Sequence, residues 1–204
     1  MVNFTAKIHL HMKSLTSLLL LTALTIGASA QKVKLIEGDV SLLKGQTTVN
    51  TKFAYDGMTI SKKEEAEADY INTKKAEYNG KTPGKGDTWA KAWVDDRQDK
   101  YEPRFDNEFA KESGMTVDSK AKYTIILKSK NLEPGYNIAI SSHPAELAAE
   151  VWVVESANPS NVIAKISITN APGRMMGADF DTGIRITECY ATAAKGLARL
   201  IRKS

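Results

Sequence analysis

The sequence has few of the side chains that support reactive chemistry. It contains one cysteine, Cys189, which excludes a disulfide within the chain. It contains three histidines, and only His143 lies beyond the first eleven residues. Any histidine-dependent metal site or nucleophile outside the N-terminal segment must therefore use His143.

The sequence also lacks an apolar run long enough to cross a membrane. The longest run, Leu15 to Ile26, has about a dozen residues, whereas a transmembrane helix needs ~20. Lys13 precedes this run and Ala28-Ser29-Ala30 follows it, which is the order of a secretory signal peptide cleaved before Gln31. The alternative is a buried core helix or an uncleaved anchor.

Residues 1–30 are thus predicted to be a signal peptide, with Met12 as a second candidate for the first residue. No cysteine directly follows the cleavage site, so lipid attachment there is not expected. We expect the mature chain to be periplasmic or secreted, with no membrane span after signal cleavage.

The net charge of the chain does not favour a nucleic-acid partner. The formal net charge is +4 at pH 7, and residues 1–30 carry two lysines, Lys7 and Lys13, so cleavage lowers it to +2. Nucleic-acid binding usually needs a concentrated basic face, for which the sequence gives no sign. Residues 31–204 are long enough for one domain with its own core.

Local patterns predict strands, then helices, then strands again. Residues 33–60 alternate as strands do, and Ser61-Lys62-Lys63-Glu64 matches a capping box that would start a helix. Helices are also predicted from about Thr88 and at Pro103. Residues 151–169 favour a buried hairpin.

The last segment is the clearest helix, because its apolar residues recur three and four apart. These are Ile186, Cys189, Tyr190, Ala193, Leu197, Leu200 and Ile201. Arg185 falls among the polar residues of the opposite side. The sequence predicts a single α+β domain, with a mostly antiparallel sheet packed by two or three helices, the C-terminal one amphipathic.

Two segments are candidates for an interaction surface. Trp89 and Trp93 lie one helical turn apart and can stack on a sugar or peptide ligand, or pack against the sheet. Arg174-Met175-Met176 lies in a loop-like stretch, and methionine suits adaptable contact surfaces. The alternative there is a loop whose methionines lie under the sheet edge.

Two sets of residues are weaker candidates for chemistry. Asp95, Asp96 and Asp99 can bind a cation or do acid–base work, but basic residues interleave with them, as on a solvated helix face. Cys189 and His143 are a conceivable nucleophilic pair, although Cys189 falls on an apolar helix face. No catalytic, cofactor or metal site is predicted.

The hairpin 151–169, the Pro172-Gly173 break and the helix from Gly183 to Ala191 resemble small uncharacterised secreted bacterial proteins. The order of elements over residues 120–202 is distantly similar to the α/β domain of TolB amino-terminal regions and of curli-secretion lipoproteins. The resemblance implies a periplasmic, non-catalytic envelope module and assigns no functional residue.

The leading interpretation is an exported binding module for another envelope protein or for a second copy of itself. The alternative is a secreted hydrolase or small-ligand enzyme with a cleft near His143 or the Asp95, Asp96 and Asp99 cluster.

Overall fold

The structure is a computed structural model that describes residues 31–138, 140–173 and 181–204. The predicted signal peptide, residues 1–30, lies outside these residues, and so do Arg174, Met175 and Met176 of the predicted contact loop. Both therefore remain predictions from the sequence.

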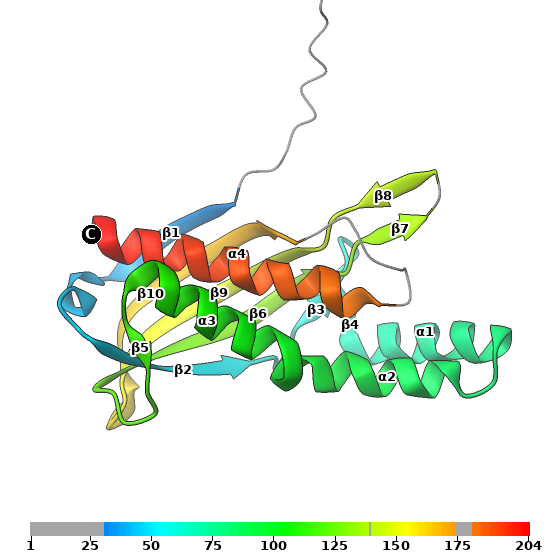
Figure 1. Ribbon diagram of the computed structural model, residues 1–204, viewed down its shortest axis with the longest axis horizontal. Coiled ribbons are helices and arrows are strands. Elements are labelled where there is room, and N and C mark those ends of the chain that lie inside the picture. The colour runs from blue at the N-terminus through cyan, green and yellow to red at the C-terminus, as the bar shows by residue number, and fades with distance from the viewer. Residues whose placement is uncertain (1–30, 139, 174–180) are drawn as a thin grey trace, which may run out of the picture.

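A mixed sheet forms the centre of the fold, in the order β1-β10-β9-β6-β2-β5 (Figure 1). Its strands are β1 (Lys32–Gly38), β2 (Thr48–Ala54), β3 (Thr59–Ile60), β4 (Glu65–Ala66), β5 (Thr116–Val117), β6 (Tyr123–Glu133), β9 (Glu146–Glu155) and β10 (Asn158–Pro172). Neighbours are antiparallel from β1 to β6, whereas β2 runs parallel to β6 and β5, and β3 runs parallel to β6. The predicted hairpin is β9–β10.

Two strands form a separate hairpin beyond the sheet, β7 (Tyr136–Ile138) and β8 (Ser141–His143). It projects from the end of β6 (Figure 1). The turn into it contains Gly135, whose φ is +64° and whose Cβ, if it had one, would lie 2.4 Å from the carbonyl oxygen of His143. Only glycine satisfies this close approach without strain.

The helices are α1 (Glu67–Lys81), α2 (Lys85–Asp96), α3 (Glu102–Ser113) and α4 (Thr182–Lys203). A π-helical turn, η2 (Arg97–Tyr101), joins α2 to α3, and a 3-10 turn, η1 (Ser41–Leu43), follows β1. Helices α3 and α4 lie side by side across one face of the sheet, while α1 and α2 form a hairpin that extends past its end (Figure 1). The predicted α+β class is confirmed.

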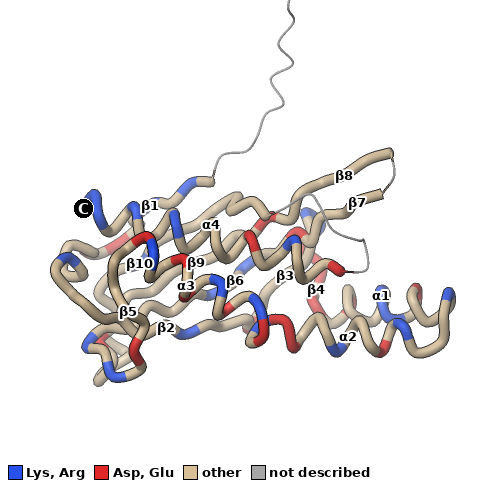
Figure 2. The backbone as a smooth tube through the Cα atoms, viewed as in Figure 1, with Lys and Arg blue, Asp and Glu red and all other residues tan. Residues whose placement is uncertain are grey.

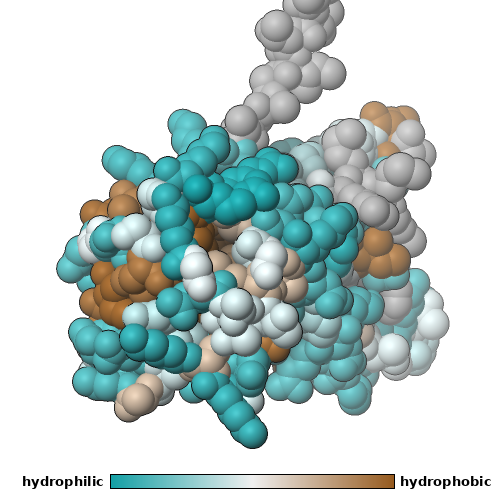
Figure 3. Space-filling view, turned by 60° about the vertical axis from the view of Figure 1, so that its left-hand side comes forward, coloured by the Kyte–Doolittle hydropathy of each residue, from teal (hydrophilic) through white to brown (hydrophobic). Residues whose placement is uncertain are grey.

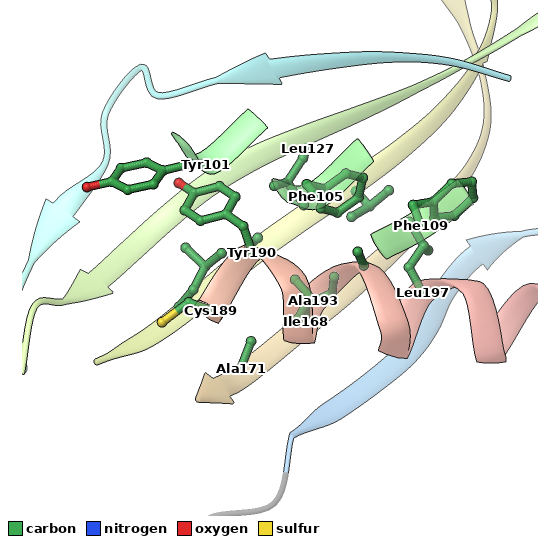
Figure 4. Close-up of a cluster of buried hydrophobic side chains, with 14 of the residues drawn as sticks. Tyr101, Phe105, Phe109, Leu127, Ile168, Ala171, Cys189, Tyr190, Ala193 and Leu197 are labelled. Atoms are coloured by element: carbon green, nitrogen blue, oxygen red, sulfur yellow. The ribbon is translucent and has the colours of Figure 1, made fainter. Parts of the chain in front are cut away.

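The core lies between this helical layer and the inner face of the sheet (Figure 4). Tyr190 of α4 stacks on Tyr101 with ring centroids 5.1 Å apart, and its hydroxyl lies 2.9 Å from that of Ser129 on β6. Phe105 and Phe109 of α3 stack at 6.0 Å, and neither is exposed. Burial of these rings supplies much of the stability of the layer.

The capping-box prediction at Ser61 is wrong. Ser61 and Glu64 have φ values of +66° and +54°, and the Ser61 hydroxyl accepts a hydrogen bond from the Lys63 amide within a turn. The chain then forms β4 before α1 begins at Glu67. The Ser-x-x-Glu spacing fits a tight turn between β3 and β4 as well as it fits a helix start.

The placement of Arg185 on a polar helix face is also wrong. Arg185 is fully buried, with its Nε 3.3 Å from the carbonyl oxygen of Pro134 and Nη2 3.4 Å from that of Gly135. A guanidinium can lie on the buried side because the turn after β6 offers it carbonyl acceptors.

Replacing Phe105 by alanine tests where the core lies. The change removes the ring that contacts Phe53 edge-on at 5.5 Å, and we expect a loss of about 3–5 kcal/mol in the free energy of unfolding. Val94→Ala on α2, where 47% of the residue is exposed, is the control and should change stability by less than ~0.5 kcal/mol. Urea unfolding measures both; similar losses would contradict this core.

Candidate binding cleft

Trp89 and Trp93 lie inside the α1–α2 hairpin, 2% and 4% exposed. The Tyr70 ring lies 5.9 Å from that of Trp89 and 5.1 Å from that of Trp93, and Tyr78 lies 5.6 Å from Trp89. The faces of both indoles are therefore occupied by packing between the two helices rather than against the sheet. Both indoles also line a pocket, and an external ligand can reach only the small part of each that is exposed there.

Glu67, at the start of α1, forms hydrogen bonds with residues at the end of α2. Its carboxylate accepts a 2.7 Å hydrogen bond from Nε1 of Trp93 and a 2.5 Å bond from Arg97. The Arg97 guanidinium also lies 4.3 Å from the centre of the Tyr55 ring on the other side. These contacts connect the helical hairpin to the body of the protein.

The first hollow, which we name the tryptophan pocket, has a volume of about 240 Å³ between α2 and the start of α4. Its lining is Thr88, Trp89, Ala92, Trp93, Asp96, Lys100, Asp181, Thr182 and Gly183. The π-helical turn η2 begins directly after Asp96 and contains Lys100. Single π-turns inside helices are frequent at functional sites.

Asp96 is the buried charge of this pocket, with only 8% of the residue exposed. Its carboxylate is 2.9 Å from Nζ of Lys100, and burial raises its pKa above the usual value despite that contact. Gly183 allows the close approach of α4, because a Cβ there would lie 1.8 Å from Oδ2 of Asp96. Nε1 of Trp89 is buried and has no hydrogen-bond partner among the described residues.

The second hollow, which we name the tyrosine cleft, is larger, at about 370 Å³. It separates α1 from the turn between β6 and β7, and it is lined by Ser61, Tyr70, Lys74, Tyr78, Glu133, Pro134, Gly135, Tyr136, Ile138 and Thr182. Thr182 lines both hollows, so they lie on either side of the start of α4.

Three tyrosines from two separate elements line this cleft. Tyr70 and Tyr78 come from α1, and Tyr136 comes from β7, where 41% of the residue is exposed. The adjacent Ile138 is 51% exposed. Only Lys74 and Glu133 of the described lining carry charge, and their signs are opposite. The cleft thus offers aromatic and apolar surface with few polar groups, as small-ligand and peptide sites do.

The predicted acidic cluster does not form one site. Asp96 faces inward, whereas Asp95 forms an ion pair with Lys91 on the outer side of α2, and Asp99 is exposed. Figure 2 shows acidic residues gathered where α2 continues into α3, but basic residues stand among them. No group of three potential metal ligands occurs in the described part of the chain.

His143 and Cys189 make separate contacts. Nδ1 of His143 donates to the carbonyl oxygen of Pro144 at 2.7 Å, which leaves Nε2 to accept from Lys62 at 3.5 Å. Cys189 is fully buried, its thiol contacts the carbonyl oxygen of Arg185, and burial raises its pKa well above the usual value. A thiol in this environment stays protonated and is a weak nucleophile.

Comparison with known proteins identifies no family. No family model matches the chain, and no curated protein matches it. One solved structure, a PelC dodecamer from Paraburkholderia phytofirmans, is 13% identical, with a TM-score of 0.41 over 84% of this chain and 97% of that chain. A single-residue variant of that dodecamer is 12% identical, with a TM-score of 0.39 over 82% and 98%. Likeness at this level defines neither fold family nor function.

None of the helices in residues 31–138, 140–173 and 181–204 is long and apolar enough to cross a membrane. What the described residues present is therefore an α+β domain with two adjoining hollows beside its helical hairpin. The sequence singled out Trp89, Trp93 and Asp96, which the structure brings together in the smaller hollow. It did not single out Tyr70, Tyr78 and Tyr136 as a set, because they belong to distant segments.

Replacing Asp96 by asparagine should change how stability depends on pH. Because burial raises the folded-state pKa of Asp96, its contribution to stability is present below the unfolded value and is lost as pH rises through the folded value. Stability of the native protein relative to Asp96→Asn should therefore fall as pH rises above about 4, the usual pKa of an aspartate. Urea unfolding at several pH values measures the difference; a difference that grows with pH would contradict the burial argument.

Proposed function

We propose that this protein is an exported binding module that holds a segment of another envelope protein in the tyrosine cleft. The observation that carries the proposal is the convergence of Tyr70, Tyr78 and Tyr136 on one hollow of about 370 Å³. Tyrosine offers a large rigid surface with a polar end, which is why it is enriched where proteins bind one another.

The chemistry of the lining supports a peptide ligand. Ile138 and the Tyr136 ring are exposed at the mouth, where an apolar partner side chain can cover them. Lys74, which is paired with Glu77, and Glu133, which accepts a hydrogen bond from the Gly135 amide, still have donor and acceptor capacity for a polar group of the ligand. Ser61 and Thr182 bring hydroxyls. The cleft's volume lies at the lower end of the range for ligand pockets, which suits one or two side chains rather than a folded domain.

The geometry supports binding over hydrolysis. A hydrolase with a serine or cysteine nucleophile needs a base within hydrogen-bond reach of that nucleophile. Both ring nitrogens of His143 contact other groups, and Cys189 is buried with a raised pKa. Asp96, the buried carboxylate of the tryptophan pocket, is paired with Lys100. No observation of the site favours the enzyme alternative in the same way.

A photo-crosslinking amino acid at position 136 tests the cleft. We expect a discrete adduct in cells when Tyr136 is replaced by p-benzoylphenylalanine, and none when Val94 on the outer side of α2 is replaced, because both positions are exposed but only one lines the cleft. Mass spectrometry identifies the partner.

The identified partner must then bind the purified protein directly. Tyr136→Ala should weaken that affinity by about tenfold or more, as removal of an interface tyrosine does, while Val94→Ala should leave it unchanged. Unchanged affinity in Tyr136→Ala, or adducts of equal yield at both positions, would reject the cleft as the binding site.

Export is the other half of the proposal, and it rests on the sequence of residues 1–30. Cleavage after Ala30 predicts a mature chain that begins at Gln31. Intact-mass measurement of the protein recovered from the periplasm or the medium should give that N-terminus. Recovery only from the cytoplasm with residues 1–30 retained would contradict export.

A further inference from the structure

The face of the sheet opposite α3 and α4 is covered by no helix of the described chain (Figure 1). Because successive side chains of a strand point to opposite faces, the buried residues show which of their neighbours point outward. On β9, Val151 and Val153 point inward and are fully buried, so Glu150 and Trp152 point outward. In the register, Trp152 lies opposite Lys165 of β10 and Ile126 of β6, and Glu150 lies opposite Ser167 and Lys128.

Lysines gather on this outer face, from four strands. We name it the lysine face. Its lysines are Lys32 and Lys34 on β1, Lys52 on β2, Lys128 and Lys130 on β6 and Lys165 on β10, and its glutamates include Glu37 on β1 and Glu146 and Glu150 on β9. The lysines outnumber the glutamates, which leaves a local excess of positive charge, although the chain as a whole is only weakly basic.

Most of this charge is not neutralised within the described residues. Lys165 pairs with Glu37 at 2.8 Å, but no carboxylate pairs with Lys34, Lys52 or Lys130 in residues 31–138, 140–173 and 181–204. Glu150 accepts a hydrogen bond from the Trp152 indole. Lys34, Lys52 and Lys130 therefore remain available to an external anion, whereas an anion at Lys165 competes with Glu37.

The Trp152 ring contacts the ammonium groups of two of these lysines. Nζ of Lys128 lies 3.1 Å from the centre of its ring and Nζ of Lys165 lies 5.6 Å from it. Cation–π attraction keeps both ammonium groups close to the sheet instead of free in solvent. Such pre-positioned cations lose less side-chain entropy when an anion binds.

A groove of about 200 Å³ lies on this face, and its lining includes Glu150 and Lys165, both of which contact Trp152. Lys130 and Lys165 contribute its cations, Glu150 a carboxylate, Ser167 and Thr169 its hydroxyls, and Ile36 and Ala148 apolar surface. It shares no lining residue with the tyrosine cleft or the tryptophan pocket. The lysine face is thus a separate surface with its own hollow.

We propose that the lysine face binds a single chain of an acidic polysaccharide. Carboxylate, sulfate or phosphate groups of the chain contact Lys128, Lys130 and Lys165, and its sugar hydroxyls hydrogen-bond with Ser167 and Thr169. The positive charge of the lysine face complements a polyanion. The alternation of lysines with hydroxyls matches a polymer that carries both anionic and hydroxyl groups.

Other anionic partners fit this face less well. A protein interface needs a desolvated apolar centre, whereas Ile36 is the one large hydrophobic residue of the described face that is mostly exposed. Figure 3 brings forward the end of the molecule at the left of Figure 1, where hydrophilic surface surrounds separate hydrophobic patches. A planar lipid surface cannot enter a narrow groove, and bulges in β1, β6 and β10 increase the twist of the sheet.

Calorimetric titration of the purified protein with alginate oligosaccharides tests the proposal, with neutral dextran of the same length as the ligand control. Lys128→Gln/Lys130→Gln should weaken alginate binding by about tenfold or more, the loss expected when a charge-assisted hydrogen bond is removed. Lys111→Gln/Lys203→Gln, on α3 and α4, removes the same charge from the opposite layer and should retain the affinity of the unmodified protein.

Binding of alginate but not dextran, lost only in the β6 variant and weakened by salt, supports the proposal. Equal losses of affinity in the two variants would show that binding depends only on unspecific charge attraction, which would overturn the proposal. Equal binding of dextran and alginate would overturn it as well. Phosphatidylglycerol vesicles that bind through Lys128 and Lys130, with no binding of alginate, would assign the face to a lipid surface instead. Absence of alginate binding at low salt would also overturn it.

Discussion

Helix α4 lies beside α3 on the inner face of the sheet, and its contacts run through the middle of the molecule. Tyr190 stacks on Tyr101 and its hydroxyl contacts Ser129, so one residue joins the helical layer to β6. Ala193 and Leu197 are fully buried further along the helix (Figure 4). Because a close-packed interior tolerates little change in volume, the position of α4 constrains both the strands below it and the helix beside it.

The same helix explains where the hollows lie. It starts at Thr182, beyond the first residues of α3, where the helical layer is no longer two helices wide (Figure 1). The α1–α2 hairpin and the turn after β6 stand around this starting point without filling it, so the tyrosine cleft and the tryptophan pocket open on its two sides. With α3 and α4 confined to one side, the other face of the sheet keeps its lysines exposed.

Sequence patterns predicted the parts of the fold whose partners are close in sequence. The spacing of Cys189, Tyr190 and Leu197 is enough to identify the buried side of α4. The β9–β10 hairpin needs only its own alternation. The π-turn η2 has no pattern of its own, and Pro103 marked the start of α3 without showing that the helix continues from α2.

Distant partners account for what could not be predicted. Arg185 is buried because carbonyl groups fifty residues earlier accept its hydrogen bonds, which helical periodicity cannot reveal. The tyrosine cleft depends on the same separation, since Tyr136 and Tyr78 meet only once β7 has folded out from the sheet. The lysine face required the strand register, because its lysines come from segments that are not consecutive.

The π-helical turn η2 has a consequence for how this chain tolerates length changes. A π-turn is one residue longer than the α-turn it replaces, and each α-helical residue rotates the chain by about 100°. Deleting one residue between Arg97 and Tyr101 would let α2 and α3 join as one regular helix, and the α1–α2 hairpin would swing around that axis relative to the sheet. The five residues of η2 therefore determine the orientation of the α1–α2 hairpin, which places it beside the start of α4.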